Sequence, residues 1–359
     1  MTLLAPVAVG FVITVLAILT LRPLAVSLEL VDRPGGRKTH HGIVPLVGGL
    51  AMFLGIVVAL GLLDLPTHVG GPLIAALGLL VVIGLLDDRF GLSPWLRLLV
   101  HVTAAVALVM LTQTYVRSMG NVLGTGPIAL NGWVSAAFSV LVITAAINAF
   151  NMLDGMDGLA GITALNSLLA LGWLGQAAGL GIESAICAVV GAPVAGFLLF
   201  NLPSPLNRRL RCFMGDAGST LLGVAIGWLC IRVCQAPTAT GVHPVTVLWA
   251  VALPLFELLW STIRRMSRGQ SPLHADAQHF HHLVMRAGFG VRGAFGLFAV
   301  LNALMAGIGI ALRRFDAPDW LSFALLMIVG ALLIIGIHDA NLMARLLART
   351  GLRRHTVRA

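Results

Sequence analysis

Residues 134–158 read VSAAFSVLVITAAINAFNMLDGMDG, an apolar segment long enough to cross a bilayer that ends in a run of polar side chains. These polar residues follow one another at a strict spacing of three: Asn148, Asn151, Asp154 and Asp157. Residues three apart lie on neighbouring turns of one helix face, so we expect the two amides and two carboxylates to form a single stripe. Carboxylates are costly in or beside hydrocarbon, so our hypothesis is that this acidic pair has a function. The alternative is a chance polar helix end at the membrane surface.

The composition of the whole chain is that of a membrane protein. Of 359 residues, 58% are hydrophobic and 10% are charged, against about 25% charged in soluble domains. Apolar stretches of about 17 to 25 residues recur along the chain, and we predict an all-α, polytopic membrane protein with about eleven transmembrane helices. The predicted spans centre near Val15, Phe53, Leu79, Val106, Val140, Leu168, Val190, Val224, Ala252, Leu301 and Met327.

The distribution of basic residues predicts the orientation, because Lys and Arg in short loops stay on the cytoplasmic side. With the N-terminus outside and the C-terminus in the cytoplasm, nineteen of the 23 basic residues lie in or beside cytoplasmic segments. We therefore expect residues 1–340 to form an integral membrane catalytic domain and residues 341–359 a basic cytoplasmic tail. The net charge of +9 then faces anionic lipid headgroups, and we expect no nucleic-acid partner.

The predicted cytoplasmic loops carry nearly all of the reactive side chains. Asp87 and Asp88 are adjacent carboxylates at the end of the third span, suited to holding a divalent cation or, if their like charges raise one pKa, to serving as a base. A solvated helix end explains the pair equally well. Asp216 lies between Gly215 and Gly218, which allow close approach of a ligand, although an ordinary turn is the alternative.

A histidine cluster lies near the C-terminal end of the predicted catalytic domain. His279, His281 and His282 can bind a metal or donate hydrogen bonds to phosphate. Their spacing is not a standard zinc pattern, so we favour phosphate contact. We interpret Glu257, in the ninth span, as a structural residue that reaches the inner surface or pairs with a nearby arginine, and we assign His101 no role.

Together these acids, histidines and basic side chains gather on one predicted membrane face. The set suits a pyrophosphate donor bound to Mg²⁺, which takes one or two carboxylates plus phosphate oxygens, while cationic groups stabilise a transferring phosphoryl centre. A membrane location implies a lipid acceptor, so the residues indicate transfer of a phospho-group to a lipid. A transporter or lipid flippase is the alternative from another class, and it predicts acids that face a midplane cavity.

Five motifs occur in order along the chain: DRP at 32–34 with RKTH at 37–40 and PLVGG at 45–49, GLLDDR at 84–89, the run at 148–158, FMGDAGS at 213–219, and GQSP at 269–272 followed by QHFHHL at 278–283. By these motifs the chain resembles the polyprenyl-phosphate N-acetylhexosamine-1-phosphate transferase superfamily, and most closely its undecaprenyl-phosphate α-N-acetylglucosaminyl 1-phosphate transferase branch. The resemblance implies that UDP-N-acetylglucosamine and undecaprenyl phosphate react to give the lipid-linked diphospho-sugar and UMP, with Mg²⁺ required or Mn²⁺ in its place.

The same resemblance implies roles for individual residues. Asp216 would be the metal ligand, and Asp87 and Asp88 would lie near the lipid phosphate, with Asp87 as the base that deprotonates it. The other matches are Gly155, Asp157 and Phe213 around the uracil, Asn151 and Asp154 in the nucleotide pocket, His279, His281 and His282 at the pyrophosphate or sugar, and Lys38 at a family lysine. We take Asp87, Asp88 and Asp154 as the catalytic candidates. A covalent phospho-enzyme stays open, but we favour direct attack, because the lipid phosphate is already an anionic nucleophile.

The chain departs from the branch at Ala277, where an arginine is usual, and thereby lacks a bidentate phosphate or carboxylate partner. Within the same chemistry, the runner-up donors are another UDP-N-acetylhexosamine or the muramoyl-pentapeptide nucleotide. We expect a multi-pass enzyme of the bacterial inner membrane that starts a lipid-linked cell-envelope polysaccharide. Its expected partners are UDP-N-acetylglucosamine, undecaprenyl phosphate and membrane lipids. The sequence allows a homodimer without demonstrating one.

Overall fold

The computed structural model describes residues 3–33, 42–203, 210–236, 241–271 and 279–338. Three sequence predictions, on Lys38, Ala277 and the tail at 341–359, lie outside these residues. The described chain forms helices joined by mostly short loops, and one pair of two-residue strands. In chain order the elements are α1 (Leu4–Ser27), β1 (Val31–Asp32), β2 (Val44–Pro45), α2 (Gly48–Gly61), α3 (Thr67–Phe90), α4 (Pro94–Thr112), α5 (Gly132–Leu153), α6 (Leu159–Ala177), α7 (Gly181–Asn201), α8 (Gly215–Gln235), α9 (Pro244–Ala250), α10 (Ala252–Ser267), α11 (Phe280–Arg286), α12 (Val291–Arg314) and α13 (Asp319–His338).

The prediction of an all-α, polytopic membrane protein is confirmed. In the described chain, nine helices are long and apolar enough to cross a bilayer. Two of the eleven predicted spans differ from a single long helix. The span around Phe53 is α2, whose 14 residues extend about 21 Å and fall short of a hydrocarbon core of about 30 Å. The span around Ala252 is broken into α9 and α10, which meet at an angle of 82°. The orientation across the membrane stays a prediction.

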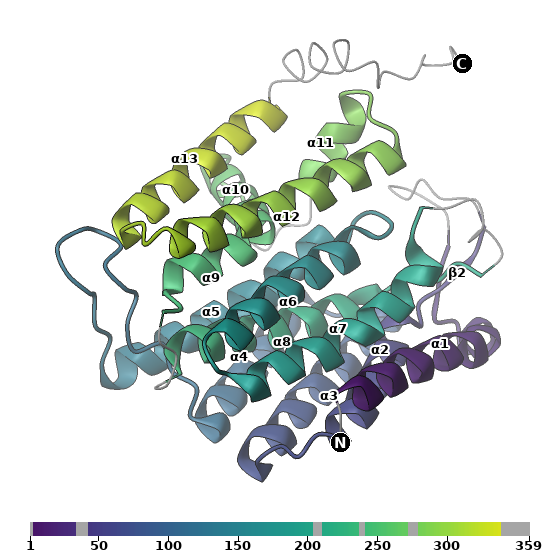
Figure 1. Ribbon diagram of the computed structural model, residues 1–359. Helices are drawn as coiled ribbons and strands as arrows, with labels where there is room; N and C mark the ends of the chain where they lie inside the picture. The colour runs from purple at the N-terminus through teal and green to yellow at the C-terminus, as the bar shows by residue number, and fades with distance from the viewer. Residues whose placement is uncertain (1–2, 34–41, 204–209, 237–240, 272–278, 339–359) are drawn as a thin grey trace.

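Helix α8 forms the centre of the bundle and packs against α3 and α5 (Figure 1). In its most apolar 18-residue stretch, 89% of the residues are buried inside the protein. Close packing with α3 depends on Gly84, because a Cβ atom there would lie 2.3 Å from the backbone of Ala217 on α8. Small residues commonly permit such approach between transmembrane helices. The contact brings the carboxylates at the end of α3 beside the first turn of α8.

The stripe predicted from residues 148–158 is only partly helical. Helix α5 ends at Leu153, and Gly158, with a φ of 74°, precedes α6. The single helical face that we expected through Asp157 is therefore wrong, because the chain turns between α5 and α6. Asn148 and Asn151 do lie three residues apart on α5, where the Asn148 side chain donates a hydrogen bond to the Thr144 carbonyl one turn back.

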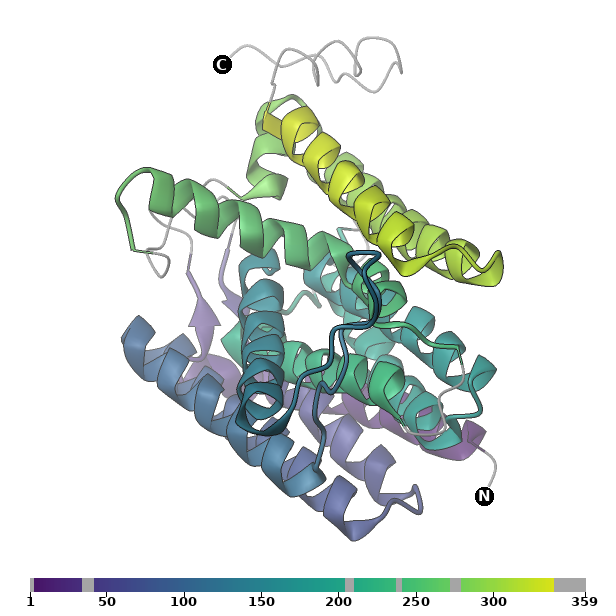
Figure 2. The ribbon, with the colours of Figure 1, turned by 90° about the vertical axis from the view of Figure 1, so that its left-hand side faces the viewer.

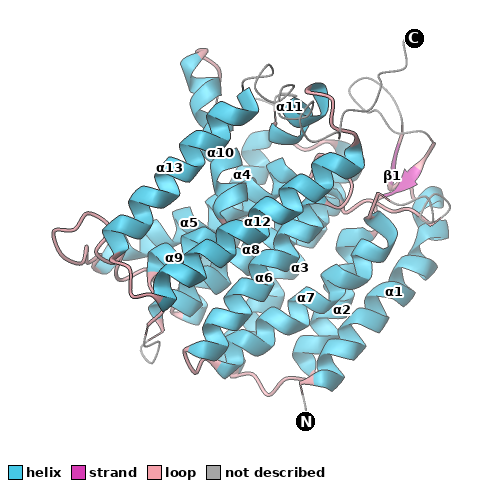
Figure 3. Cartoon of the chain, turned by 45° about the horizontal axis from the view of Figure 1, so that its top comes forward, coloured by secondary structure: helices cyan, strands magenta, loops and turns pink. Residues whose placement is uncertain are grey.

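The remaining elements cover the edges of this bundle. Figures 1 and 2 show α12 and α13 on one side of the molecule, where α12 packs against α6 and α9. The antiparallel pair of β1 and β2 lies beyond the end of α1 (Figure 3). Beyond β2 the chain contacts the segment before α8, because Phe213 N–H donates to the Pro45 carbonyl at 2.9 Å and Gly48 N–H donates to the Phe213 carbonyl at 3.0 Å. These bonds fix the backbone of Phe213.

Candidate functional site

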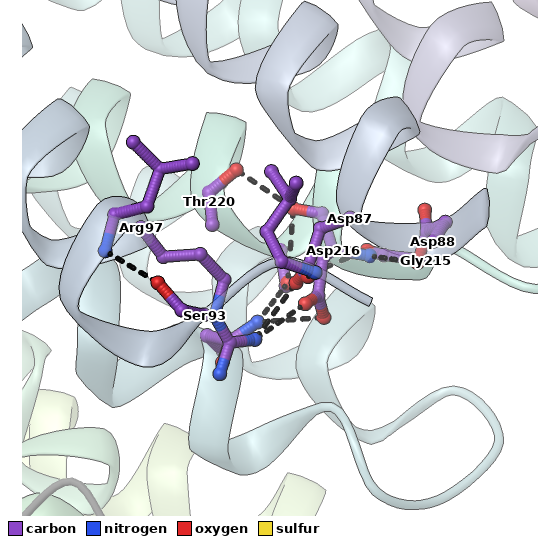
Figure 4. A network of polar contacts seen from close by, with 11 residues as sticks. Asp87, Asp88, Ser93, Arg97, Gly215, Asp216 and Thr220 are labelled. Carbon is purple, nitrogen blue, oxygen red and sulfur yellow. Dashed lines mark hydrogen bonds and ion pairs between the residues drawn. The ribbon is translucent and has the colours of Figure 1, made fainter. Parts of the chain in front are cut away.

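Two carboxylates from different helices share one guanidinium group at the meeting point of α3, α4 and α8 (Figure 4). Arg97 Nη1 donates to Asp87 Oδ2 at 2.8 Å and to Asp216 Oδ2 at 3.0 Å. The Leu92 N–H donates to the other oxygen of Asp87 at 2.6 Å. Ser93 caps α4 by accepting a hydrogen bond from a backbone N–H of the first turn. The short loop between α3 and α4 thus sets Arg97 opposite Asp87.

Asn151 and Asp88 complete the polar contacts around Asp216. Asn151 Nδ2 donates to Asp216 Oδ1 at 2.9 Å and to Ser219 Oγ at 3.1 Å. Asp88 Oδ1 accepts a hydrogen bond from the Asp216 N–H at 3.0 Å. Asp88 Oδ2 is buried and has no hydrogen-bond partner among the described residues. One oxygen of Asp88 is thus anchored by the first turn of α8, and the other is buried beside Gly215.

The residues predicted around the nucleotide also come together. Asp157 forms an ion pair with Arg211, whose guanidinium lies 4.8 Å from the ring centroid of Phe213. The buried Asn201 joins the two segments, because it accepts a hydrogen bond from the Gly158 N–H at 2.7 Å and donates to the Cys212 carbonyl at 2.8 Å. Sequence reasoning missed Asn201, which stands at the apolar end of α7 outside every motif.

Asp154 lies between these two groups of residues. Burial raises the pKa of its carboxyl to about 7, and the negative charges of Asp88 and Asp157 act in the same direction. The carboxyl is therefore about half protonated near neutral pH. A carboxyl group with a pKa perturbed in this way is common in functional sites.

His281 packs directly on the turn that contains Asp154. Its side chain is 1% exposed, and a Cβ atom on Gly155 would lie 2.4 Å from the ring. Neither ring nitrogen has a hydrogen-bond partner among the described residues, and the ring of His282 is 4.2 Å away between centroids. Burial, together with the neighbouring histidines, lowers the pKa of His281 well below its usual value. A neutral imidazole with unsatisfied nitrogens therefore faces the site.

Glu257 anchors the other end of the histidine segment. Its side chain is fully buried, and Oε1 lies 2.8 Å from His279 Nδ1. The Phe280 N–H donates to Oε2 at 2.9 Å, and Ser261 Oγ donates to Oε1 at 3.1 Å. These contacts agree with the interpretation of Glu257 as a structural residue, although its side chain is buried and does not reach the surface. It links α10 to the start of α11.

A small cavity opens beside the shared guanidinium. Its lining comes from α3, α4, α5 and α8: Leu80, Ile83, Gly84, Asp87, Arg97, His101, Asn151, Asp216 and Thr220. Arg97 and His101 were not among the sequence candidates. Only the helical register of α4 could have indicated them, since Arg97 and His101 are one turn apart and share a face.

The oxygen donors suit Mg²⁺ better than zinc. Asp87 Oδ2 and Asp216 Oδ2 converge on one point, and Asp88 Oδ2 is buried without a partner. Mg²⁺ prefers oxygen ligands and usually takes one or two carboxylates, with substrate phosphates and waters completing its shell. Among the described residues, no group of three or more His, Cys, Asp or Glu side chains is placed to hold a metal by itself. The donor set therefore fits a cation whose coordination the substrate completes.

The structure brings every described candidate into one connected region, from Asp87 and Asp88 through Asp216 and Asn151 to the 154–158 turn, Phe213 and the histidines. Lys38 lies outside the described residues. The individual roles stay predictions.

Comparison with known proteins gives a consistent result. The profile of glycosyl transferase family 4 matches residues 71–234. An undecaprenyl-phosphate α-N-acetylglucosaminyl 1-phosphate transferase of Salmonella typhi is 37% identical over 342 residues, which cover 94% of this chain and 92% of the relative. The proteins of the same name from Yersinia pestis and Escherichia coli K12 are 37% and 36% identical, over 91% and 94% of this chain and 89% and 92% of their own lengths.

Proposed function

The chain belongs to glycosyl transferase family 4, in the branch of the undecaprenyl-phosphate α-N-acetylglucosaminyl 1-phosphate transferases, and we propose that it transfers N-acetylglucosamine 1-phosphate from UDP-N-acetylglucosamine to undecaprenyl phosphate. The products are UMP and the lipid-linked diphospho-sugar. We further propose that the enzyme is a multi-pass protein of the bacterial inner membrane and that its product starts a cell-envelope polysaccharide. The names of its relatives and its apolar helices support this proposal.

The observation that carries the proposal is the convergence of Asp87 and Asp216 on a single cationic group. Carboxylates placed this close require a positive partner, and a phosphate-bound divalent cation supplies one. Bound Mg²⁺ would supply charge neutralisation for the pyrophosphate and for the departing UMP. Asp216 and Asp87 would hold it through their Oδ2 atoms.

The reaction needs positioning more than proton transfer. An oxygen of the lipid phosphate forms a bond to the sugar-linked phosphorus, while the bond between this phosphorus and the bridging oxygen breaks and UMP leaves with that oxygen. Direct attack suits this site because the lipid phosphate is already anionic. Asp87 and Asp88 orient the approach, and Asp87 accepts the proton when the lipid phosphate arrives protonated.

The turn between α5 and α6 supplies the proposed nucleotide side of the site. Arg211 lies over the ring of Phe213, and we propose that this aromatic side chain contacts the uracil ring. Asp157, held by its ion pair with Arg211, is proposed to accept a hydrogen bond from the base. His281 donates a hydrogen bond to the pyrophosphate or sugar as a neutral imidazole, in keeping with its lowered pKa.

An assay of purified protein with undecaprenyl phosphate and a panel of UDP-sugars tests the reaction and the donor together. We expect UMP release with UDP-N-acetylglucosamine and Mg²⁺, and none with the muramoyl-pentapeptide nucleotide. Asp216→Asn is expected to abolish this release while the protein still folds in membranes. Transfer from another nucleotide sugar alone would overturn the proposed donor, and full activity of the Asp216 variant at ordinary Mg²⁺ would remove Asp216 from the metal role.

A further inference from the structure

The guanidinium of Arg97 occupies the point at which the site converges. A single atom, Nη1, lies 2.8 Å from Asp87 Oδ2 and 3.0 Å from Asp216 Oδ2. Asp87 lies ten residues before Arg97 in the chain, whereas Asp216 lies 119 residues after it. The convergence of the two oxygens on Arg97 is therefore a product of the fold. Two carboxylate oxygens around one positive centre also describe how a divalent cation is held.

Both carboxylates are fixed by contacts that do not involve Arg97. The Leu92 N–H holds Oδ1 of Asp87 at 2.6 Å, and Asn151 Nδ2 holds Oδ1 of Asp216 at 2.9 Å. Arg97 contacts only the second oxygen of each group. If the guanidinium left, the two Oδ2 atoms would keep their positions and remain directed at a common point.

Arg97 itself is placed so that it can leave. Its side chain is 32% exposed, whereas that of Asp87 is 7% exposed. An arginine carries several rotatable bonds, and its planar fork suits phosphate as well as carboxylate. The cavity beside it is lined by Asn151 and Thr220, so a displaced guanidinium has space next to the two carboxylates.

We propose that Arg97 stands in for the divalent cation, holding Asp87 and Asp216 together in the metal-free protein and yielding their Oδ2 atoms when the cation binds. The inference rests on the metal dependence proposed above. Arg97 and the metal then compete for the same two oxygens. The displaced guanidinium becomes a donor for the phosphates that arrive with the metal.

Metal affinity, measured without substrate, tests the proposal. Binding of Mn²⁺ to the purified full-length protein is followed by electron paramagnetic resonance of the free ion, for the wild type and for Arg97→Gln. Arg97→Gln should bind Mn²⁺ about tenfold more tightly than the wild type, because the substitution removes a positive charge within a few ångströms of the cation and a competitor for the same two oxygens. Mn²⁺ should also raise the melting temperature of Arg97→Gln more than that of the wild type, because it replaces the missing partner of both carboxylates.

Two controls separate local competition from net charge. Arg89 is an exposed arginine in the last turn of α3, and its guanidinium lies over the Phe90 ring. The variant Arg89→Gln therefore makes the same change in net charge as Arg97→Gln. It should leave Mn²⁺ affinity within about twofold, because exposed charges are largely screened. Arg97→Lys keeps the positive charge and should bind Mn²⁺ less tightly than Arg97→Gln.

The outcomes distinguish this inference from the proposed function. Unchanged or weaker Mn²⁺ binding by Arg97→Gln, in a wild type that binds Mn²⁺, overturns the role of Arg97 alone. Equal tightening by Arg89→Gln overturns it as well. If neither the wild type nor Arg97→Gln binds Mn²⁺, the proposed metal site fails together with this inference. An Arg97→Gln protein that excess Mn²⁺ does not stabilise also contradicts the proposal, because the cation should replace the guanidinium.

Discussion

Gly155→Ala is expected to disable the enzyme through a single contact. Gly155 does not adopt a left-handed backbone, so alanine is tolerated there by the main chain. The new Cβ atom would lie 2.4 Å from Cε1 and Nε2 of His281, whereas ordinary contact begins near 3.4 Å. The ring or the turn must therefore shift by about 1 Å, and His281, at 1% exposure, has little space in which to move.

The size of the effect follows from this displacement. A misplacement of about 1 Å in a catalytic arrangement costs on the order of 100-fold in rate. The steric conflict should cost about 1 to 3 kcal/mol of stability, the usual range for overpacking. We therefore expect kcat for UMP release to fall about 100-fold in a protein that still folds, with a melting temperature a few degrees lower.

The matched control is Gly296→Ala, in the second turn of α12. Nothing lies within 4 Å of the Cβ position there, so the same chemical change should leave kcat unaltered and raise stability slightly, by about 0.5 to 1 kcal/mol, because alanine favours a helix. The double variant Gly155→Ala/His281→Ala adds a second check, because removing the ring removes the conflict. Its activity should equal that of His281→Ala alone. Full activity of Gly155→Ala, or additive losses in the double variant, would refute this reasoning.

Three further predictions concern neighbouring parts of the site. The pKa of Asp154 is raised from 3.8 to about 7 in the folded protein, so the folded state binds the proton more tightly and stability should fall as pH rises from about 4 through about 7. Asp154→Asn should remove this dependence and melt a few degrees higher than the wild type above pH 7, as measured by thermal scans across pH. Glu257→Ala leaves the buried Phe280 N–H unpaired and should cost about 1 to 3 kcal/mol, whereas Glu257→Gln should retain most of the stability in the same thermal assay. Cysteines introduced beside Asp154 and His281 should react with an impermeant maleimide only from the cytoplasmic side; reaction from outside would reverse the predicted topology.

The helices could be predicted because hydrophobic length is a local property of the sequence. Each predicted span corresponds to a helix or to a broken pair, and the errors are local as well. The stripe at 148–158 fails after Leu153 because Gly158, in the left-handed region, starts a new helix there, and a spacing of three does not report backbone conformation. The break between α9 and α10 was missed because both halves remain apolar on average.

The residues that position the site could not be predicted in the same way. Asn201 and Glu257 act across the fold. The hydrogen-bond partners of Asn201 lie 11 and 43 residues away in the chain, and Glu257 contacts His279 and Phe280, which are 22 and 23 residues away. Arg97 is ten residues from Asp87 but 119 from Asp216, and only the packing of α3 against α8 brings its two partners together. Motifs indicate the candidate reacting groups, while the residues that hold them depend on three-dimensional contacts.

Electrostatics explains why this site requires a cation from the chain itself. Asp87 and Asp88 lie at the C-terminal end of α3, where the helix dipole disfavours negative charge, whereas Asp216 lies in the first turn of α8, where the dipole favours it. The close contact at Gly84 places Asp87 and Asp88 directly beside Asp216. Neither helix end can neutralise the charge of the three carboxylates. Helix α4 supplies a guanidinium, that of Arg97, at the point where Asp87 and Asp216 meet. Because this positive charge satisfies the fold before any ligand arrives, a divalent cation that binds there must replace an existing interaction, and the affinity for metal is then set as much by Arg97 as by the carboxylates.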